Sequence, residues 1–176
     1  MKNKYILGIA WNIHNRSACL LKNGKIACAI EEDHLDRRKH SLALYLTRDT
    51  DKQIHVIPPL QAINYCLEKE GIGLDDLELI VSWGEKGRYD PSNYLPIKNK
   101  NKILLEKSHH LLHAYSTYSV SPFKKATIIV VDGEGTYMDP ALYESISIYK
   151  GSGNNIKPLK QVFTDKNKEL SLGKFY

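Results

Sequence analysis

Two histidines four residues apart, His109 and His113, are candidate ligands for one metal ion. They lie in the run Ser108-His109-His110-Leu111-Leu112-His113-Ala114, which favours a helix that Ser108 can cap. Residues four apart share one face of a helix, so the two imidazoles can reach the same cation. His110 points elsewhere and could donate a supporting hydrogen bond. The alternative is three ordinary surface or capping histidines.

A second candidate is the segment Asp132-Gly133-Glu134-Gly135-Thr136, which follows the apolar run Ala126 to Val131. Glycines allow backbone N–H groups to approach a phosphate closely. Ligands of α/β sheets also gather at the carboxyl ends of strands. We therefore expect Asp132, Gly133 and Gly135 to border a phosphate group, the alternative being a plain turn.

Two further polar segments could take part. The loop from Asn12 to Ser17 joins two expected strands and carries His14 and Arg16, which suit a phosphate or a reacting hydroxyl, the alternative being an ordinary connection between strands. The acidic run Glu31 to His34 precedes the basic run Arg37 to His40. Such charges are usually solvated surface, but arginine and lysine beside a pocket can bind an acyl phosphate.

The elements that must position these residues follow from hydrophobic periodicity and turn signals. Asn23-Gly24 predicts a two-residue hairpin, because both residues accept positive φ. The expected elements are strands at 5–10, 17–22 and 25–30, a helix starting at Pro58-Pro59 and ending at Gly71, a strand at 77–83, a loop at 84–102, a helix from 108 to 118, and strands at 126–131, 145–149 and 157–163. This order predicts an α/β fold, a mixed sheet that begins with a three-stranded antiparallel unit and is covered by helices.

Composition narrows the function classes. The 176 residues, 42% of them hydrophobic, are enough for one domain with its own core. The net charge of +5 suits an anionic ligand such as a nucleotide or an acyl phosphate, or is a solvated lysine-rich surface. The basic residues are scattered and no nucleic-acid motif is present, so we expect no nucleic-acid partner.

Cys19, Cys28 and Cys66 are typical of buried thiols in a reducing compartment. No apolar run is long enough to span a bilayer and no signal peptide is visible, so we expect a cytoplasmic protein.

Taken together and in order, these segments resemble the N-terminal domain of the O-carbamoyltransferases of antibiotic and nodulation-factor biosynthesis. The resemblance is carried by Ile6-Leu7-Gly8-Ile9, His14-Asn15-Arg16-Ser17-Ala18, Asn23-Gly24-Lys25-Ile26, Ala29-Ile30-Glu31-Glu32, Arg37-Arg38-Lys39-His40, the run from Pro59 to Leu67, His109 to Ala114, Ser121-Pro122-Phe123 and Val131 to Gly135. The helical histidine motif is also shared with the tRNA threonylcarbamoyl transferases and the hydrogenase-maturation carbamoyltransferase. The resemblance implies one half of an actin-like, ribonuclease H-like domain.

The resemblance also implies a mechanism with two linked sites. A C-terminal domain makes carbamoyl-adenylate from carbamoyl phosphate and ATP, and the N-terminal domain, with a divalent metal that is usually iron, moves the carbamoyl group to a hydroxyl of a small molecule. By resemblance, the metal ligands are His109 and His113, the residues near the adenylate phosphates are Asp132, Gly133 and Gly135, the residue near the acceptor hydroxyl is His14, and a further phosphate contact is Lys39.

The sequence departs from the family pattern at three positions. Asn15 stands for an aspartate, His34 for an arginine, and Thr136 for an acid. The resemblance further implies that a third metal ligand, an aspartate, lies in a second half of the domain and that the adenylate-forming domain lies beyond it. We therefore expect an incomplete fragment, which needs its missing half or assembles as a homo-oligomer.

Two other functions stay open. One is another actin-like ATPase, resembling a sugar kinase or a chaperone, although such an enzyme needs an acid in the first hairpin and Asn15 opposes it. The other is a non-catalytic binding partner that keeps the fold, which the three departures favour.

Overall fold

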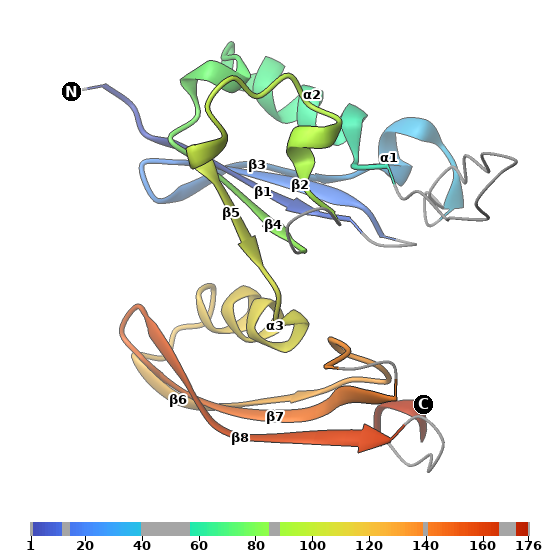
Figure 1. The fold of residues 1–176 in the computed structure, drawn as a ribbon. Helices are drawn as coiled ribbons and strands as arrows, with labels where there is room; N and C mark the ends of the chain where they lie inside the picture. Colours follow the sequence, from blue (N-terminus) through green and yellow to red (C-terminus); the bar gives the residue numbers. More distant parts are fainter. Residues whose placement is uncertain are drawn as a thin grey trace, which may run out of the picture. The chain divides into compact units, whose positions relative to one another are not determined.

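The computed structural model places the β-strands in two separate sheets, and it describes residues 2–11, 15–39, 57–84, 89–138, 141–165 and 172–175. The chain divides into two units, residues 1–106 and 107–176, and each unit contains one of the sheets. Figure 1 shows both sheets with their helices. The predicted α/β class is confirmed.

The first sheet has five strands in the order β3-β2-β1-β4-β5. Strands β1 (Tyr5–Ala10), β2 (Ser17–Lys22) and β3 (Lys25–Glu31) form the predicted antiparallel unit. The turn between β2 and β3 uses Asn23 and Gly24, whose φ angles are 51° and 78°. Strands β4 (Leu79–Trp83) and β5 (Ile103–Glu106) continue the sheet in parallel from β1. The sequence did not indicate β5, because four residues at a sheet edge carry too short a pattern.

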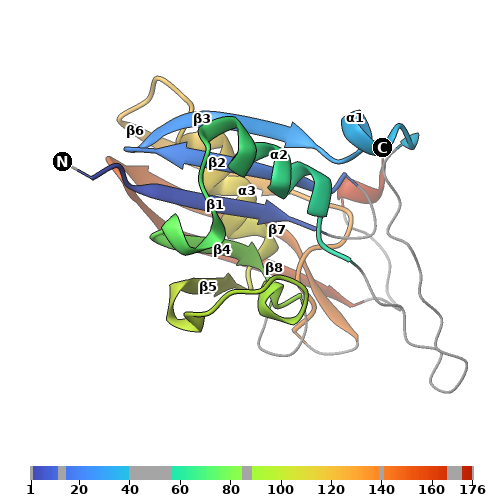
Figure 2. The same ribbon diagram turned by 90° about the horizontal axis from the view of Figure 1, so that it is seen from above.

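Helix α2 (Leu60–Glu70) covers one face of this sheet, as Figure 2 shows. Its buried residues pack with Leu7, Ile9 and Leu20 in one core; they are Ala62, Ile63, Cys66 and Leu67. The helix ends at Gly71, which has φ 64° and donates its N–H to the last turn. Cys66 is buried as expected, whereas Cys19 and Cys28 are partly exposed.

The expectation that the charged run 31–34 is solvated surface is wrong for Glu32. Its side chain is buried, with the residue only 4% exposed, and it accepts hydrogen bonds from the first amides of α2. The N–H groups of Gln61 and Ala62 lie 3.1 and 2.7 Å from its Oε1 and Oε2. A carboxylate at a helix N-terminus satisfies amides that have no partner within the helix. The next residues form the short helix α1 (Asp33–Asp36).

Arg16 is also part of the fold. It is buried, and its Nη1 donates to the carbonyl oxygens of Ile57 and Pro58 at 2.8 and 3.4 Å. Its Nη2 lies 4.0 Å from Oδ2 of Asp36. This guanidinium therefore joins the end of the first loop to α1 and to the chain that enters α2.

The second unit consists of one helix on a three-stranded antiparallel sheet. Helix α3 (His109–Tyr118) packs on strands β6 (Lys125–Val131) and β7 (Leu142–Ser152), and β8 (Asn155–Asp165) follows in the order β6-β7-β8. Its core is formed by Ala114, Tyr118, Ile128, Val130, Tyr149 and Ile156. Strands β7 and β8 extend beyond the predicted 145–149 and 157–163, because their pairing continues through polar residues to the turn at Gly153-Asn154.

The remaining regular elements are short. They are the 3₁₀ turns η2 (Leu74–Asp76), η3 (Pro91–Asn93), η4 (Lys100–Lys102) and η5 (Leu172–Phe175). Turn η2 explains why β4 begins at Leu79 rather than at the predicted Leu77, which instead ends the turn and is buried. In the described part of the chain, every helix is too short or too polar to cross a membrane.

Candidate metal centre

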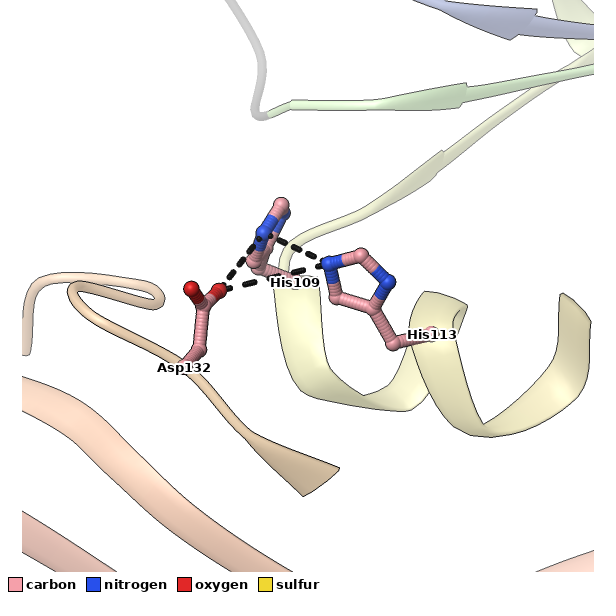
Figure 3. Close-up of side chains that lie close together, drawn as sticks. All are labelled: His109, His113 and Asp132. Atoms are coloured by element: carbon pink, nitrogen blue, oxygen red, sulfur yellow. Dashed lines mark hydrogen bonds and ion pairs between the residues drawn. The ribbon is translucent and has the colours of Figure 1, made fainter. Parts of the chain in front are cut away.

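Three side chains of the second unit converge on one point. The Nε2 atoms of His109 and His113 lie 2.9 Å apart. Oδ2 of Asp132 lies 3.0 Å from Nε2 of His109 and 4.0 Å from Nε2 of His113. Figure 3 shows the two rings and the carboxylate pointing toward one another. One potential ligand atom from each of the three residues lies within 4.8 Å of the other two.

Helix α3 sets the positions of the two imidazoles. Ser108 caps the helix by accepting a hydrogen bond from the N–H of Leu111 at 3.1 Å. His109 is thus the first helical residue, and His113 follows one turn later on the same face. Their ring centroids are 4.4 Å apart and the ring planes are nearly perpendicular, at 87°.

The turn after β6 sets the position of Asp132. The Asp132 N–H donates to the carbonyl oxygen of Ser145 on β7 at 3.1 Å, which extends the β6–β7 pairing by one residue. Oδ1 of Asp132 accepts the N–H of Gly133 at 2.7 Å, and Oδ2 faces the histidines. The sequence had assigned Asp132 and Gly133 to phosphate binding. In the structure Oδ1 of Asp132 is bonded to Gly133 and Oδ2 is directed toward His109 and His113, and phosphate binding stays a prediction.

The pKa shifts of His113 and Asp132 favour the deprotonated forms of these side chains. The hydrogen bond from His109 lowers the pKa of Asp132, against a smaller opposing effect of burial. Burial lowers the pKa of His113, and the neighbouring His109 lowers this pKa further. Metal ligands must be deprotonated. At neutral pH Asp132 is therefore a carboxylate and His113 a neutral imidazole.

His110 belongs to the core below the site. It is fully buried, and its Nδ1 lies 2.8 Å from Oγ of Ser147 on β7. Among the described residues its Nε2 has no hydrogen-bond partner. Gly135 passes so close that a Cβ there would lie 2.6 Å from this Nε2. The glycine at position 135 is thus required by packing, which is a different reason from the predicted approach to phosphate.

Glu144 is a residue that sequence reasoning missed. It is 3% exposed, on β7, and Ser108 Oγ and Gln161 Nε2 donate to its Oε1 at 3.2 and 3.1 Å. The N–H of Thr136 donates to its Oε2 at 3.3 Å. The available signal was a carboxylate between Tyr143 and Ser145 in the run from Leu142 to Tyr149, whose other residues are apolar, aromatic or small.

Two other predicted residues, His14 and Lys39, belong to the first unit. His14 lies outside the described residues. Lys39 is exposed in the first unit, whose placement relative to the second is not defined.

Gly173 packs against the backbone of Asp132 and Gly133, so closely that a side chain at position 173 would overlap that backbone.

A groove of about 290 Å³ runs beside the centre. It is lined by His113 and Thr117 of α3 and by Ile128, Ile129, Val130, Val131 and Asp132. The groove therefore follows β6 and reaches His113 and Asp132.

Comparison with known proteins places this chain in a family. Residues 5–95 match the family model described as carbamoyltransferase N-terminus. The nodulation protein NolNO of Sinorhizobium fredii is 28% identical over 173 residues, covering 84% of this chain and 22% of NolNO.

Two solved structures share the fold. YeaZ from Pseudomonas aeruginosa has a TM-score of 0.54 at 10% identity and covers 95% of this chain and 69% of YeaZ. The activator of the 2-hydroxyisocaproyl-CoA dehydratase from Clostridium difficile, with bound ADPNP, has a TM-score of 0.52 at 18% identity and covers 97% of this chain and 49% of the activator. Both neighbours have actin-like folds.

The chain spans between 22% and 32% of the length of the curated relatives it matches. The family model itself covers residues 5–95, slightly more than half of the chain. This chain therefore belongs to the carbamoyltransferase N-terminus family and has an actin-like fold.

Proposed function

We propose that this chain is the N-terminal part of an O-carbamoyltransferase and that His109, His113 and Asp132 hold its divalent metal, with iron as the first choice. The observation that carries the proposal is the convergence of two imidazole nitrogens and one carboxylate oxygen within 4.8 Å. The reaction we propose for the complete enzyme transfers a carbamoyl group to a small-molecule hydroxyl. Family membership and the likeness to NolNO support this reaction class.

The donor set fits a divalent transition metal. Two histidines and one carboxylate are typical of ferrous sites, and imidazole also suits zinc, copper and nickel. The lowered pKa values of His113 and Asp132 keep these two groups in the form that binds metal. The aspartate that the family resemblance implies from a second half of the domain would then be an additional ligand.

A metal bound here would supply a Lewis acid that polarises the carbamoyl carbonyl. The residues of the chain have the other tasks. Asp132 and the two histidines would hold the ion, beside the groove that follows Ile128 to Val131. His14 is our candidate for accepting the proton of the acceptor hydroxyl, because an imidazole can do so near neutral pH.

We further propose that the donor is carbamoyl-adenylate, formed from carbamoyl phosphate and ATP by a domain outside this sequence. The likeness to an activator whose structure holds ADPNP supports nucleotide use at the level of the fold. Lys39, Gly133 and Gly135 are our candidates for phosphate contacts. The N–H of Gly133 already donates to Asp132, so a phosphate at this residue would have to share that donor or displace the carboxylate.

Metal binding is tested by titrating the purified chain with Co²⁺ and following its visible absorption. We expect one site, lost in His109→Ala and in His113→Ala. The matched control is His34→Ala, because His34 belongs to the other group that could hold a metal among the described residues, with Glu31 and Asp33. Loss of binding in His34→Ala with retention in the other two variants would overturn the proposed centre.

The reaction is tested by mixing this chain with the remainder of a full-length relative as a second polypeptide. Carbamoylated acceptor, formed from labelled carbamoyl phosphate and ATP and dependent on His109 and His113, is the expected result. A chain that binds metal and docks but yields no product would instead support the non-catalytic partner that the departures at Asn15 and Thr136 favour.

A further inference from the structure

We infer that Thr136 and Glu144 are positioning residues that lock the Asp132 turn to the N-terminus of α3 and thereby set the distance between Asp132 and the two histidines. This inference rests on the proposed metal centre. It concerns two residues that lie outside the ligand set. Thr136 also stands at a position where the family pattern has an acid.

The need for such a lock follows from the chain path. His109 and His113 belong to one helix, so their spacing is local. Asp132 lies 19 residues after His113, beyond the end of α3 and the whole of β6. The hydrogen bonds between β6 and β7 hold Asp132 to the sheet, but they do not join it to the first turn of α3.

The hydroxyl of Thr136 makes the connection. Its Oγ1 accepts the N–H of His109 at 2.8 Å and donates to the carbonyl oxygen of Lys107 at 2.8 Å. The His109 N–H is one of the helical amides without a partner inside the helix. The Thr136 side chain is thus hydrogen-bonded to the residues on either side of Ser108, and one of these is the candidate ligand His109.

Glu144 makes a second connection from β7. Its carboxylate accepts one hydrogen bond from the hydroxyl of Ser108, which caps α3, and another from the N–H of Thr136 in the turn. Backbone bonds reinforce the pair, because Gly135 N–H donates to the Glu144 carbonyl at 2.8 Å and Glu144 N–H donates to that of Thr136 at 3.0 Å. The helix cap and the turn therefore share one buried anion.

Metal sites depend on such supporting bonds, and their loss typically lowers metal affinity by roughly 10- to 100-fold. We expect Thr136→Val to weaken Co²⁺ binding within that range, because valine keeps the shape and removes both hydroxyl bonds. Thr136→Ser keeps the hydroxyl and should restore wild-type affinity. Thr127→Val on the exposed part of β6 is the matched control and should bind Co²⁺ like wild type.

Glu144→Gln is the second variant. An amide NH₂ on one side would face the fixed N–H of Thr136, and on the other side it would remove the oxygen that accepts from Ser108 Oγ and Gln161 Nε2. We expect a loss of Co²⁺ affinity comparable to that of Thr136→Val. Thermal unfolding of each metal-free variant separates a misplaced ligand from an unfolded chain.

A metal-free readout separates this inference from the proposed function. In the amide NMR spectrum of the metal-free chain, Thr136→Val should speed hydrogen exchange at His109 and shift the signal of Gly133, whose N–H bonds Asp132. Unchanged exchange and shifts overturn the inference whether or not metal binds. Wild-type Co²⁺ affinity in Thr136→Val, or equal losses in Thr136→Val and Thr136→Ser, also overturns it. A wild-type chain that binds no Co²⁺ contradicts the proposed centre alone.

Discussion

Oδ2 of Asp132 lies 3.0 Å from Nε2 of His109, although one residue directly follows a strand and the other begins a helix. The contact joins a carboxylate with a lowered pKa to a ring that lies on the same helical face as a second imidazole. A carboxylate with a shifted pKa beside two imidazoles is typical of functional sites. The predictions below test its chemistry and the fold that holds it.

Metal affinity should depend on pH through the ligands themselves. Burial, aided by His109, lowers the pKa of His113, and the bond from His109 lowers that of Asp132, so protons compete for these two groups only at more acidic pH than usual. We expect the contribution of these two groups to Co²⁺ affinity to be constant from pH 8 down to about 6.5, the ordinary histidine value, and to fall below it. Co²⁺ titrations between pH 5 and 8 measure this. An affinity that rises toward acidic pH would contradict the assignment.

The same shifts predict how the metal-free chain responds to acid. Both groups have a folded pKa below the unfolded value, so the unfolded chain binds more protons. Their contribution to stability is therefore present at neutral pH. The part due to His113 is lost as pH falls below about 6.5, and that of Asp132 only below about 4. Urea unfolding of wild type and His113→Gln across this range checks the first loss, which the variant should lack.

Glu32→Gln should destabilise the first unit. The buried carboxylate accepts two amide hydrogen bonds at the start of α2, and an amide side chain can accept with only one oxygen. We expect a loss of about 1–3 kcal/mol in the free energy of unfolding, the usual range for a buried bonded group left without its partner. The exposed neighbour offers the control, since Glu31→Gln should change little. Equal urea midpoints for the two variants would show that the cap is unimportant.

Gly135→Ala should destabilise the second unit by overpacking. The added Cβ would lie 2.6 Å from Nε2 of His110 and 2.8 Å from Cβ of Glu144, both of which are buried. Forcing a methyl group into a filled core costs about 1–3 kcal/mol. Gly73→Ala is the control, because its Cβ would meet only Oδ2 of Asp76 at 3.9 Å. Differential scanning calorimetry should show a lower unfolding temperature for the first variant alone.

The chain by itself should not complete the transfer reaction. The match covers only 22% to 28% of the length of three curated relatives, and we assign adenylate formation to residues outside this sequence. Incubation with carbamoyl phosphate, ATP, Fe²⁺ and a panel of hydroxylated acceptors should give no product above a His109→Ala, His113→Ala double variant. Product formation that depends on the two histidines would show that these 176 residues contain a complete catalytic unit.

Local patterns in the sequence determined much of this protein. The strand–turn–strand signal around Asn23-Gly24 predicted β2 and β3, and the apolar spacing after Pro59 predicted α2, because these patterns depend on residues within one or two turns of each other. The spacing of His109 and His113 predicted one shared helical face for the same reason. The order of the motifs indicated the family, which the match over residues 5–95 confirms.

Only the tertiary structure decided which residues join the two histidines. Asp132 reaches them because β6 pairs with β7 and α3 packs on both strands, and no local pattern encodes that distance. Glu32 and Glu144 read as ordinary charges in sequence, yet each is buried against the first turn of a helix that lies 29 or more residues away in the chain. Long-range contacts of this kind follow from packing of the whole unit, so a carboxylate that binds, one that caps a helix and one that is solvated have the same appearance in the sequence.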